Sequence, residues 1–598
     1  MNDTGYTQQD FDKLFQRNEK LENECRQLKE RLDLLMEENN KLETELHKLK
    51  KNENVEFYNE RTKTYDLKLH LCIYSLLDNH VAYQNVGAVI ENSTKPPNKL
   101  PAISTIQNWS LERGILARKQ IVGTAVDTVN TTLHTDEASK YGSKWGALAT
   151  RDSEGNNTFL GLRDMATKSS HDTLETFKNI LSDIDSVCSN NESPAQKIIC
   201  YIRNTMTSTE TKFNELLAEY RTDILPNVRE KYEEMSENEK AALSRMNNFF
   251  CGHHTLMHMA DVSAKSLYEV KKGHFKNEIP IHNVSFSWHN SYNLNGLQII
   301  CQKKRSKIWL SLHFVTFITQ LLKDNQMRGL PLQPLKGNRF NILFTNAGHV
   351  YFLKSQMIAY LESCPALNGL LQSVIFDLRQ PFFIIGCKSL GLISKHITTP
   401  LWNIIENQEV SISDMNIRYV RLINYIAECV ENLDDFIREY LLLYDDVPVK
   451  RDKMYEKLIK PSEIDCHVIV ILSVIFPNLI QLIQRQFGSH LPGGSNEHIN
   501  EHETSSVDKH NQYPERVFSY ADHILSSKPN IKTLALEAFS LNKTHAWLSQ
   551  REEVLQLIEE SRKEVETEKK KLREEEISRK RSEKQQEEFV KKEDLERE

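Results

Sequence analysis

One aspartate stands at a position where a carboxylate could do chemistry. Residues 131–144 read TTLHTDEASKYGSK, so a run rich in β-branched residues carries the chain to Asp136, and a Tyr-Gly turn follows. Aspartate commonly forms turns at the ends of strands, which is one interpretation of this residue. The other interpretation is that its carboxylate is one ligand of a catalytic metal ion. The elements around Asp136 must decide between the two.

The surrounding segment has the alternation that is typical of β-strands. Three strands are predicted over 125–139, 144–157 and 158–166, with a Ser-Glu-Gly-Asn-Asn hairpin turn at the end of the second. An amphipathic helix over 169–184, capped by Ser170, leads to a fourth strand over 197–204, and another helix follows. A meander of three strands, a crossover helix and a parallel fourth strand form an RNase H-like arrangement.

Folds of this kind place metal-binding carboxylates on the first strand and at the end of the fourth. With a later third carboxylate, they can hold a pair of Mg²⁺ ions that activates water and stabilises the leaving oxygen in phosphoryl transfer. Asp136 occupies the first position. The second position is predicted to lack its acid, because no carboxylate lies near Asn204 and Glu210 follows only a helical turn or more beyond.

Three further stretches, in this order along the chain, resemble motifs of the hAT-superfamily transposases. Residues 247–263, NNFFCGHHTLMHMADVS, resemble the CxxH motif of that family through Cys251 and His254. Residues 337–362 stand where the family has an Arg-Trp helix inside a long helical insertion, although phenylalanine replaces the tryptophan here. Residues 513–542 resemble the stretch Ser-Glu-Arg-x-Phe-Ser, with proline in place of the first serine.

The resemblance extends over roughly residues 65–545 and implies roles for individual residues. Asp136 stands in the place of the first catalytic acid and Glu515 in the place of the third, so a competent enzyme would bind Mg²⁺ or Mn²⁺ there. Cys251 and His254 are expected to pack in the core, since no second thiol lies nearby to complete a familiar zinc site. Taken singly, Asp136 could instead form a turn, and Glu515 could favour a helix start.

Three functions are compatible with these residues. We expect a domesticated or decayed hAT-like transposase that binds DNA without cutting it, because the second acid near Asn204 is missing. An active DNA transposase would need another acid to join Asp136 and Glu515 around Mg²⁺ or Mn²⁺. A coiled-coil interaction scaffold with protein partners is the third.

Residues 61–122 are predicted to form a helix-turn-helix-like module. Two short helices precede a proline-containing loop, and a third helix follows that Ser104 can cap and Gly114 ends. The predicted partner of this module is double-stranded DNA. Lysines would contact its phosphates, and the other side chains would face a groove. The residues are Lys95, Lys99, Thr105, Gln107, Asn108 and Arg113. An ordinary helical hairpin packed on the next domain is an equally good interpretation.

The rest of the chain is predicted to be mostly helical, so the expected fold class is α+β, mostly α. We expect a parallel dimeric coiled coil (1–60), the helical module (61–122), the first part of the RNase H-like core (123–230), an all-helical insertion (231–485), a flexible loop (486–510), the C-terminal core helices (511–550) and a charged, solvent-exposed helical tail (551–598). The formal net charge of −7 gives no overall sign of a nucleic-acid binder. The apolar window 466–483 is interrupted by polar residues and proline and predicts a buried helix, with no membrane partner.

Cysteine usage and the N-terminus bear on localisation. The ten cysteines are scattered without a CxxC pair, which fits a reducing compartment. The first residues show no signal peptide. We therefore expect a nuclear protein, or otherwise a cytoplasmic one, and not a secreted one.

The coiled coil rests on a strict seven-residue repeat of leucines. The leucines are Leu14, Leu21, Leu28, Leu35, Leu42 and Leu49. Taken as d positions, they put Asn18 and Asn39 at a positions, which favours a parallel two-stranded register. The predicted partner is therefore a second copy of this chain.

Replacing Leu28 and Leu35 together by lysine should convert the dimer into a monomer of 69.6 kDa, because two charges enter the apolar seam. Light scattering coupled to size-exclusion chromatography measures the mass. Glu30→Lys with Glu37→Lys, on the outer f positions, should leave the dimer intact. A wild-type monomer, or a dimer that survives the leucine changes, would contradict the zipper.

Overall fold

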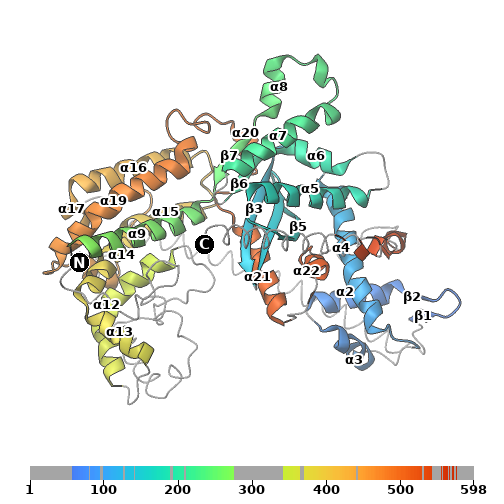
Figure 1. The fold of residues 1–598 in the computed structure, drawn as a ribbon, viewed down its shortest axis with the longest axis horizontal. Coiled ribbons are helices and arrows are strands. Elements are labelled where there is room, and N and C mark those ends of the chain that lie inside the picture. Colours follow the sequence, from blue (N-terminus) through green and yellow to red (C-terminus); the bar gives the residue numbers. More distant parts are fainter. Residues whose placement is uncertain are drawn as a thin grey trace, which may run out of the picture. The chain divides into compact units, whose positions relative to one another are not determined.

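The computed structural model describes residues 57–274 and 341–541 and scattered positions between 554 and 574. Gaps within these ranges fall at 80, 94–97, 126–127, 141, 189–192, 208–210, 364–368, 439–441, 528–530 and 532. The predicted coiled coil and Lys95 lie outside the described residues. The chain divides into two compact units, residues 1–117 with 541–580 and residues 118–540 with 581–598, and each is described by itself (Figure 1).

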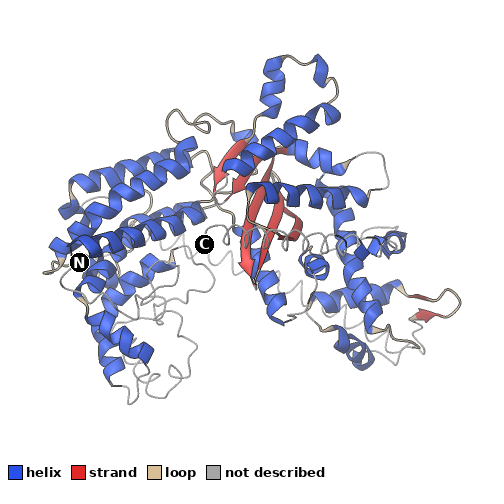
Figure 2. Ribbon diagram, viewed as in Figure 1, coloured by secondary structure: helices blue, strands red, loops and turns tan. Residues whose placement is uncertain are grey.

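The described residues are mostly helical, with one mixed five-stranded sheet (Figure 2). This composition confirms the predicted α+β, mostly α class at that level of detail.

The first unit contains a short hairpin and the predicted trio of helices. Its elements are β1 (Tyr58–Asn59), β2 (Thr64–Tyr65), α2 (Leu67–Asp78), α3 (Tyr83–Ser93) and the first part of α4 (Ile103–Ala125). Asp66 caps α2 by accepting a hydrogen bond from the backbone N–H of Lys68. The predicted end of the third helix at Gly114 is wrong, because α4 runs on to Ala125. A glycine costs a helix only about 1 kcal/mol, and buried Ile115 and Leu116 outweigh that cost.

The C-terminal tail also belongs in part to the first unit. Its described residues between 554 and 574 are helical, and Val554, Ile558 and Val565 are buried. The expectation of a solvent-exposed single helix is therefore wrong for this stretch. The apolar residues, spaced by four and seven positions, give the charged sequence one buried face.

The second unit is organised around the sheet. Its strands are β3 (Thr131–Lys140), β4 (Ser143–Arg151), β5 (Asn157–Met165), β6 (Ile202–Thr207) and β7 (Asn247–Phe250). The strand order is β5-β4-β3-β6-β7, in which β3, β4 and β5 are antiparallel and β6 and β7 run parallel to β3. The meander and the parallel fourth strand are thus present as predicted, and β3, which carries Asp136, is the central strand.

Two details of the prediction around this sheet are wrong. Residues 197–201 are helical, because Ser193 caps α6 (Pro194–Tyr201) and Pro194 starts it, so β6 begins only at Ile202. The supposedly all-helical insertion contains β7, whose four residues are too short to show strand alternation.

Helices cover both faces of the sheet. On one face lies α5 (Ser170–Ser186), which is capped by Ser169 rather than by Ser170, and its Thr173 donates a hydrogen bond to Glu137. The neighbouring residue Asp136 points to the other face, since successive strand residues alternate.

The helices between β6 and β7 are α7 (Thr211–Val228), η1 (Tyr232–Glu234) and α8 (Glu237–Ser244).

A large helical body follows β7. Its elements are α9 (Gly252–His274), α12 (Ile342–Glu362), α13 (Gly369–Arg379), α14 (Pro381–Ile393), the π-helix η4 (Ser394–Thr398), α15 (Thr399–Glu406), α16 (Met415–Glu431), α17 (Leu433–Arg438), α18 (Lys453–Ile459) and α19 (Asp465–Phe487). Among the described helices, α19 alone has the length and hydropathy of a membrane span. One such helix is weak evidence for a membrane protein, because the core helix of a globular protein has the same properties. Its residues Leu472, Phe476 and Leu479 are fully buried in the body, as predicted for a core helix.

The chain returns from α19 to the sheet through a segment that was predicted to be a flexible loop. It contains η5 (Gly488–His490) and α20 (Glu501–Thr504), and Asn496, Ser506 and Lys509 are buried. The prediction of a flexible loop is wrong, because polar side chains in this segment bond to the sheet and to the helical body. We call residues 500–511 the strap.

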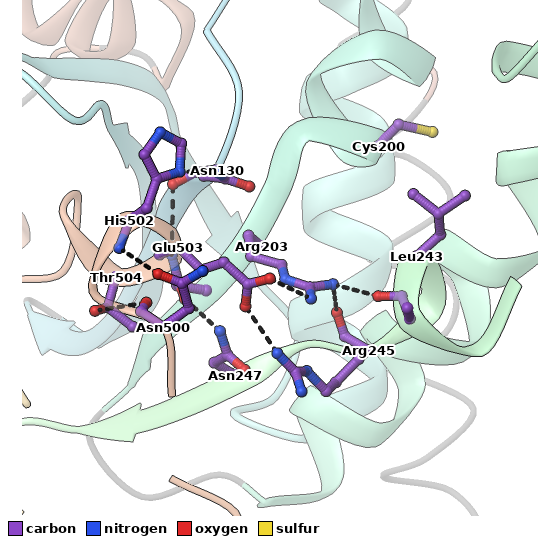
Figure 3. A network of polar contacts seen from close by, with 12 residues as sticks. Asn130, Cys200, Arg203, Leu243, Arg245, Asn247, Asn500, His502, Glu503 and Thr504 are labelled. Carbon is purple, nitrogen blue, oxygen red and sulfur yellow. Dashed lines mark hydrogen bonds and ion pairs between the residues drawn. The ribbon is translucent and has the colours of Figure 1, made fainter. Parts of the chain in front are cut away.

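Glu503 anchors the beginning of the strap where β6 and β7 start. Its carboxylate pairs with Arg203 at 3.0 Å and with Arg245 at 2.8 Å (Figure 3). The side-chain amide of Asn204 donates to the backbone oxygen of Glu503 at 2.7 Å and also receives a bond from Asn247 at 3.0 Å. These charge-assisted bonds fix the strap next to two strands.

The strap then runs along β3, with one polar contact to every second residue of the strand. The hydroxyl groups of Thr132 and Ser506 lie 2.8 Å apart. Two residues further on, Nδ1 of His134 donates to the side-chain oxygen of Asn511 at 2.9 Å, and the amide of Asn511 donates to the backbone oxygen of Thr135 at 2.7 Å. The next residue on this face of β3 is Asp136.

The helices α21 (Gln512–Ser527) and α22 (Thr533–Ser540) begin directly after the strap. Arg163 of β5 pairs with Glu537 of α22 and with Asp183, so α22 is held at the opposite edge of the sheet. The strap therefore determines where the first turn of α21 lies.

Replacing Asn511 by alanine should lower the free energy of unfolding of the second unit by about 1–3 kcal/mol, because buried donors and acceptors on β3 lose their partners. Urea unfolding followed by circular dichroism measures the change. Asn403→Ala, at an exposed position of the same unit, should shift it by less than about 0.5 kcal/mol. Equal stability of the two variants would show that the strap is not held by Asn511.

Candidate metal centre

Three side chains from distant parts of the chain meet beside the central strand. Asp136 comes from the middle of β3, His254 from the first turn of α9, and Glu515 from the first turn of α21. One possible ligand atom from each lies within 4.8 Å of the others. The Nε2 atom of His254 is 3.5 Å from the Oε1 atom of Glu515.

The local sequence explains how each side chain reaches this point. The backbone N–H of Cys251 bonds to the oxygen of Thr207, which ties the end of β7 to the end of β6, and α9 starts at the next residue. The sulfur of Cys251 accepts the backbone N–H of Asn511 at 3.1 Å. The CxxH motif thus performs two tasks: Cys251 holds the end of the strap, and His254 points into the centre.

Gly252 allows the strap to approach this closely. Its backbone N–H donates to the oxygen of Lys509 at 3.0 Å. A Cβ atom at this position would lie 3.1 Å from that same oxygen and 2.8 Å from Ile405. A side chain here would push the strap or α15 away, so glycine is required by the packing.

The centre is an enclosed group of charges. Asp136 and His254 are buried, and Glu515 is partly buried. Burial alone would lower the pKa of His254, but Cys251, Glu515 and Asp136 outweigh that effect and raise it to about 10. Without a metal ion, His254 is therefore an imidazolium at neutral pH and balances part of the charge of the two carboxylates.

The donor set fits a divalent metal ion. Carboxylate oxygens suit Mg²⁺ and Mn²⁺, whereas an imidazole nitrogen is more usual for Zn²⁺ and other transition metals. Two carboxylates with one imidazole therefore favour Mn²⁺ or Zn²⁺ over Mg²⁺. Binding would displace the proton of His254, so the ion would compete with that proton for the same nitrogen.

The structure brings together the two acids that were predicted for the site, Asp136 and Glu515. It adds His254, which the sequence assigned to core packing. His254 was missed because β7, whose end places the first turn of α9 at the sheet edge, is too short to show strand alternation in the sequence.

Asn204 does not lie at this centre. It pairs with Thr132, four residues before Asp136 on the neighbouring strand, and its side chain is bonded to the strap. On the neighbouring strand β6, Met206 pairs with His134. The positions beside Asp136 therefore fall at and just beyond Thr207. Residues 208–210 lie outside the described part of the chain. Within the described residues, the group of possible ligands consists of Asp136, His254 and Glu515.

The residues predicted to contact DNA have different environments. Lys99 is exposed, with its Nζ atom 4.0 Å from the centre of the Tyr58 ring. Gln107 and Asn108 are exposed, and Asn108 accepts a hydrogen bond from Lys569 of the tail at 2.7 Å, while Thr105 is half-buried.

The prediction for Arg113 is wrong. Its side chain is buried and forms an ion pair with Asp78, so it cannot reach a DNA groove. Arg113 follows Ile106 and Trp109 by seven and four positions on α4, and these spacings place all three on the buried face.

The known proteins give no family for this chain. No protein-family model matches the sequence, and no curated protein matches it either. The site is therefore interpreted from its own geometry.

The variants Asp136→Asn and Glu515→Gln should each weaken Mn²⁺ binding by at least about tenfold, because each removes one anionic ligand. Isothermal titration of the full chain with MnCl₂ measures the affinity. Asp522→Asn, on the same helix as Glu515, should retain the wild-type affinity. Binding that is unchanged in both site variants would place the Mn²⁺ elsewhere.

Proposed function

We propose that this chain is a transposase-derived DNA-binding protein with an RNase H-like core that has lost strand cleavage. One observation carries the proposal: Asp136 and Glu515, which the hAT resemblance implied as the first and third acids, adjoin at the central strand. Nearly the whole second unit separates these residues in sequence. Their meeting requires the sheet, the helical body and the strap to be arranged together.

The topology of the second unit supports this proposal. A three-stranded meander is followed by two strands parallel to the first, and the order β5-β4-β3-β6-β7 puts the acid-bearing strand in the middle. The long helical body lies between β7 and the strap, as expected for an insertion between the second and third acids. The insertion begins after β7 rather than at residue 231.

The residues of the centre would act on a DNA phosphate in simple ways. Asp136, His254 and Glu515 would hold a divalent ion, and such an ion supplies positive charge that binds and polarises phosphate oxygens. The first turns of α9 and α21 contribute the positive ends of two helix dipoles. The strap keeps Glu515 in place and closes the centre from the side of β3.

The number of ligands among the described residues supports the proposed loss of cleavage. A two-metal site holds one ion on each side of the reacting phosphate, and it needs enough carboxylates to bind both ions. Two carboxylates and one imidazole supply enough ligands for one metal ion. Such a centre can hold a phosphate without promoting both the attack and the departure of oxygen atoms.

An active DNA transposase that cuts and joins strands with Mg²⁺ or Mn²⁺ is the second candidate. Glu210 is the acid that favours it, because in the sequence it stands three positions after Thr207, the last residue of β6, although it lies outside the described residues. A third carboxylate beside Asp136 and Glu515 would complete the set.

Duplex DNA of about 30 base pairs, added to the full chain with MnCl₂, should bind with an affinity that falls as salt rises and should stay intact. Filter binding and denaturing gels measure the two properties. Asp136→Ala should reduce the part of the affinity that depends on Mn²⁺, while Asp522→Asn should not.

Two results would contradict this proposal. Absence of salt-sensitive binding would remove DNA as the partner. Metal-dependent cleavage that disappears in Asp136→Ala and in Glu210→Gln would establish the active enzyme instead.

A further inference from the structure

The first unit contains a pocket of about 610 Å³ that the metal centre does not use. It is formed by the β1–β2 hairpin, the start of α4 and the helical part of the tail. Its lining includes Lys63, Lys99, Trp109, Glu112 and Arg562, with the tyrosines of the hairpin. A volume of this size is typical of sites for small organic ligands.

Aromatic rings form one wall of the pocket. Tyr58 and Tyr65 lie 4.8 Å apart between ring centres, and Tyr65 meets Trp109 edge to face at 5.4 Å. His70 lies against Trp109 with 3.6 Å between the ring centres, so the orientation of the indole is fixed from behind. A wall of this kind suits a flat, partly apolar ring.

Cationic side chains are concentrated at the same pocket. Lys63, Lys99 and Arg562 line it, whereas Glu112 is the single acidic residue among the lining residues. Lys63 is exposed at the tip of the hairpin, where its φ of 55° belongs to a tight turn. The excess of positive charge suits an anionic group such as a phosphate.

Glu112 provides the feature that points most directly to a ligand. Its side chain is fully buried, its partners are Tyr74 and Arg562, and neither carboxylate oxygen has a donor in good hydrogen-bond geometry among the described residues. The nearest cation is Arg562, whose Nε atom is 3.7 Å away. Burial raises the pKa of Glu112 to about 8. A buried carboxyl whose partners are this poorly aligned is costly, and a donor or acceptor edge of a ligand would offset that cost.

We propose that this pocket binds a phosphorylated nucleoside. The base lies against the aromatic wall, its polar edge bonds to the carboxyl of Glu112, and the phosphate lies between Lys63 and Lys99. The tail completes the site, since Arg562 and Val565 form one side of it. The ligand is either a free mononucleotide or the terminal nucleotide of a nucleic-acid strand.

This site is independent of the metal centre, because all of its residues belong to the first unit. Loss of nucleotide binding would therefore leave the Mn²⁺ affinity unchanged. Failure of the metal centre would likewise leave nucleotide binding intact, so the two proposals can fail separately.

The test is isothermal titration of the full chain, without added metal, using AMP, GMP, CMP and UMP, a 5′-phosphorylated ten-nucleotide single strand, and inorganic phosphate. We expect saturable binding of at least one nucleotide or of the strand, and at least tenfold weaker binding of phosphate. Binding of mononucleotides identifies a free nucleotide as the ligand, whereas binding of the strand alone identifies a strand end.

Variants then locate the binding. Lys63→Ala with Lys99→Ala should weaken it by at least tenfold, and so should Glu112→Gln if the chain keeps its helical circular dichroism spectrum. Lys68→Ala, at an exposed position on α2 outside the pocket, should have no effect. Absence of binding, equal binding of phosphate and nucleotide, or full affinity in the double lysine variant would each overturn the proposal.

Discussion

The structure of the second unit depends on how the strap is held against β3, and Asn511 is the central residue of that contact. Its side chain bonds to His134 and to the backbone of Thr135, and its own N–H bonds to Cys251. These contacts place the start of α21 next to the strand, so that Glu515, one turn later, adjoins Asp136. The strap also ends the long excursion through the helical body, since the chain leaves the sheet after β7 and returns to it beside β3.

The charges of the centre explain why this arrangement must be maintained. Two carboxylates and an imidazole that are largely removed from water are unfavourable unless they neutralise one another or bind a cation. Asp136 and Glu515 raise the pKa of His254, as does Cys251, so the group is an internal ion cluster in the absence of metal. A divalent ion would take over the role of the proton. Under the proposed function, the same three residues stabilise the fold without metal and would bind a phosphate through the metal ion when it is present.

The sequence predicted those parts that local patterns determine. The β-branched run around Asp136, the meander and the core helix α19 all have strong periodicity, and the position of Glu515 came from a motif on one helix. Long-range contacts were not predictable in this way. The strap looked like a mobile polar loop because its partners lie between 99 and 377 residues away in the sequence, and β7 was too short to be noticed. Arg113 has a polar side chain on a buried helix face, where Asp78 neutralises it.

The central claim is that Asp136, His254 and Glu515 form one site for a divalent ion. The most direct test is an anomalous difference map from crystals of the chain grown or soaked with MnCl₂. We expect a single strong peak at about 2.0–2.3 Å from an oxygen of each carboxylate and from a nitrogen of His254. A map with no peak there, with His254 still paired to Glu515, would contradict it.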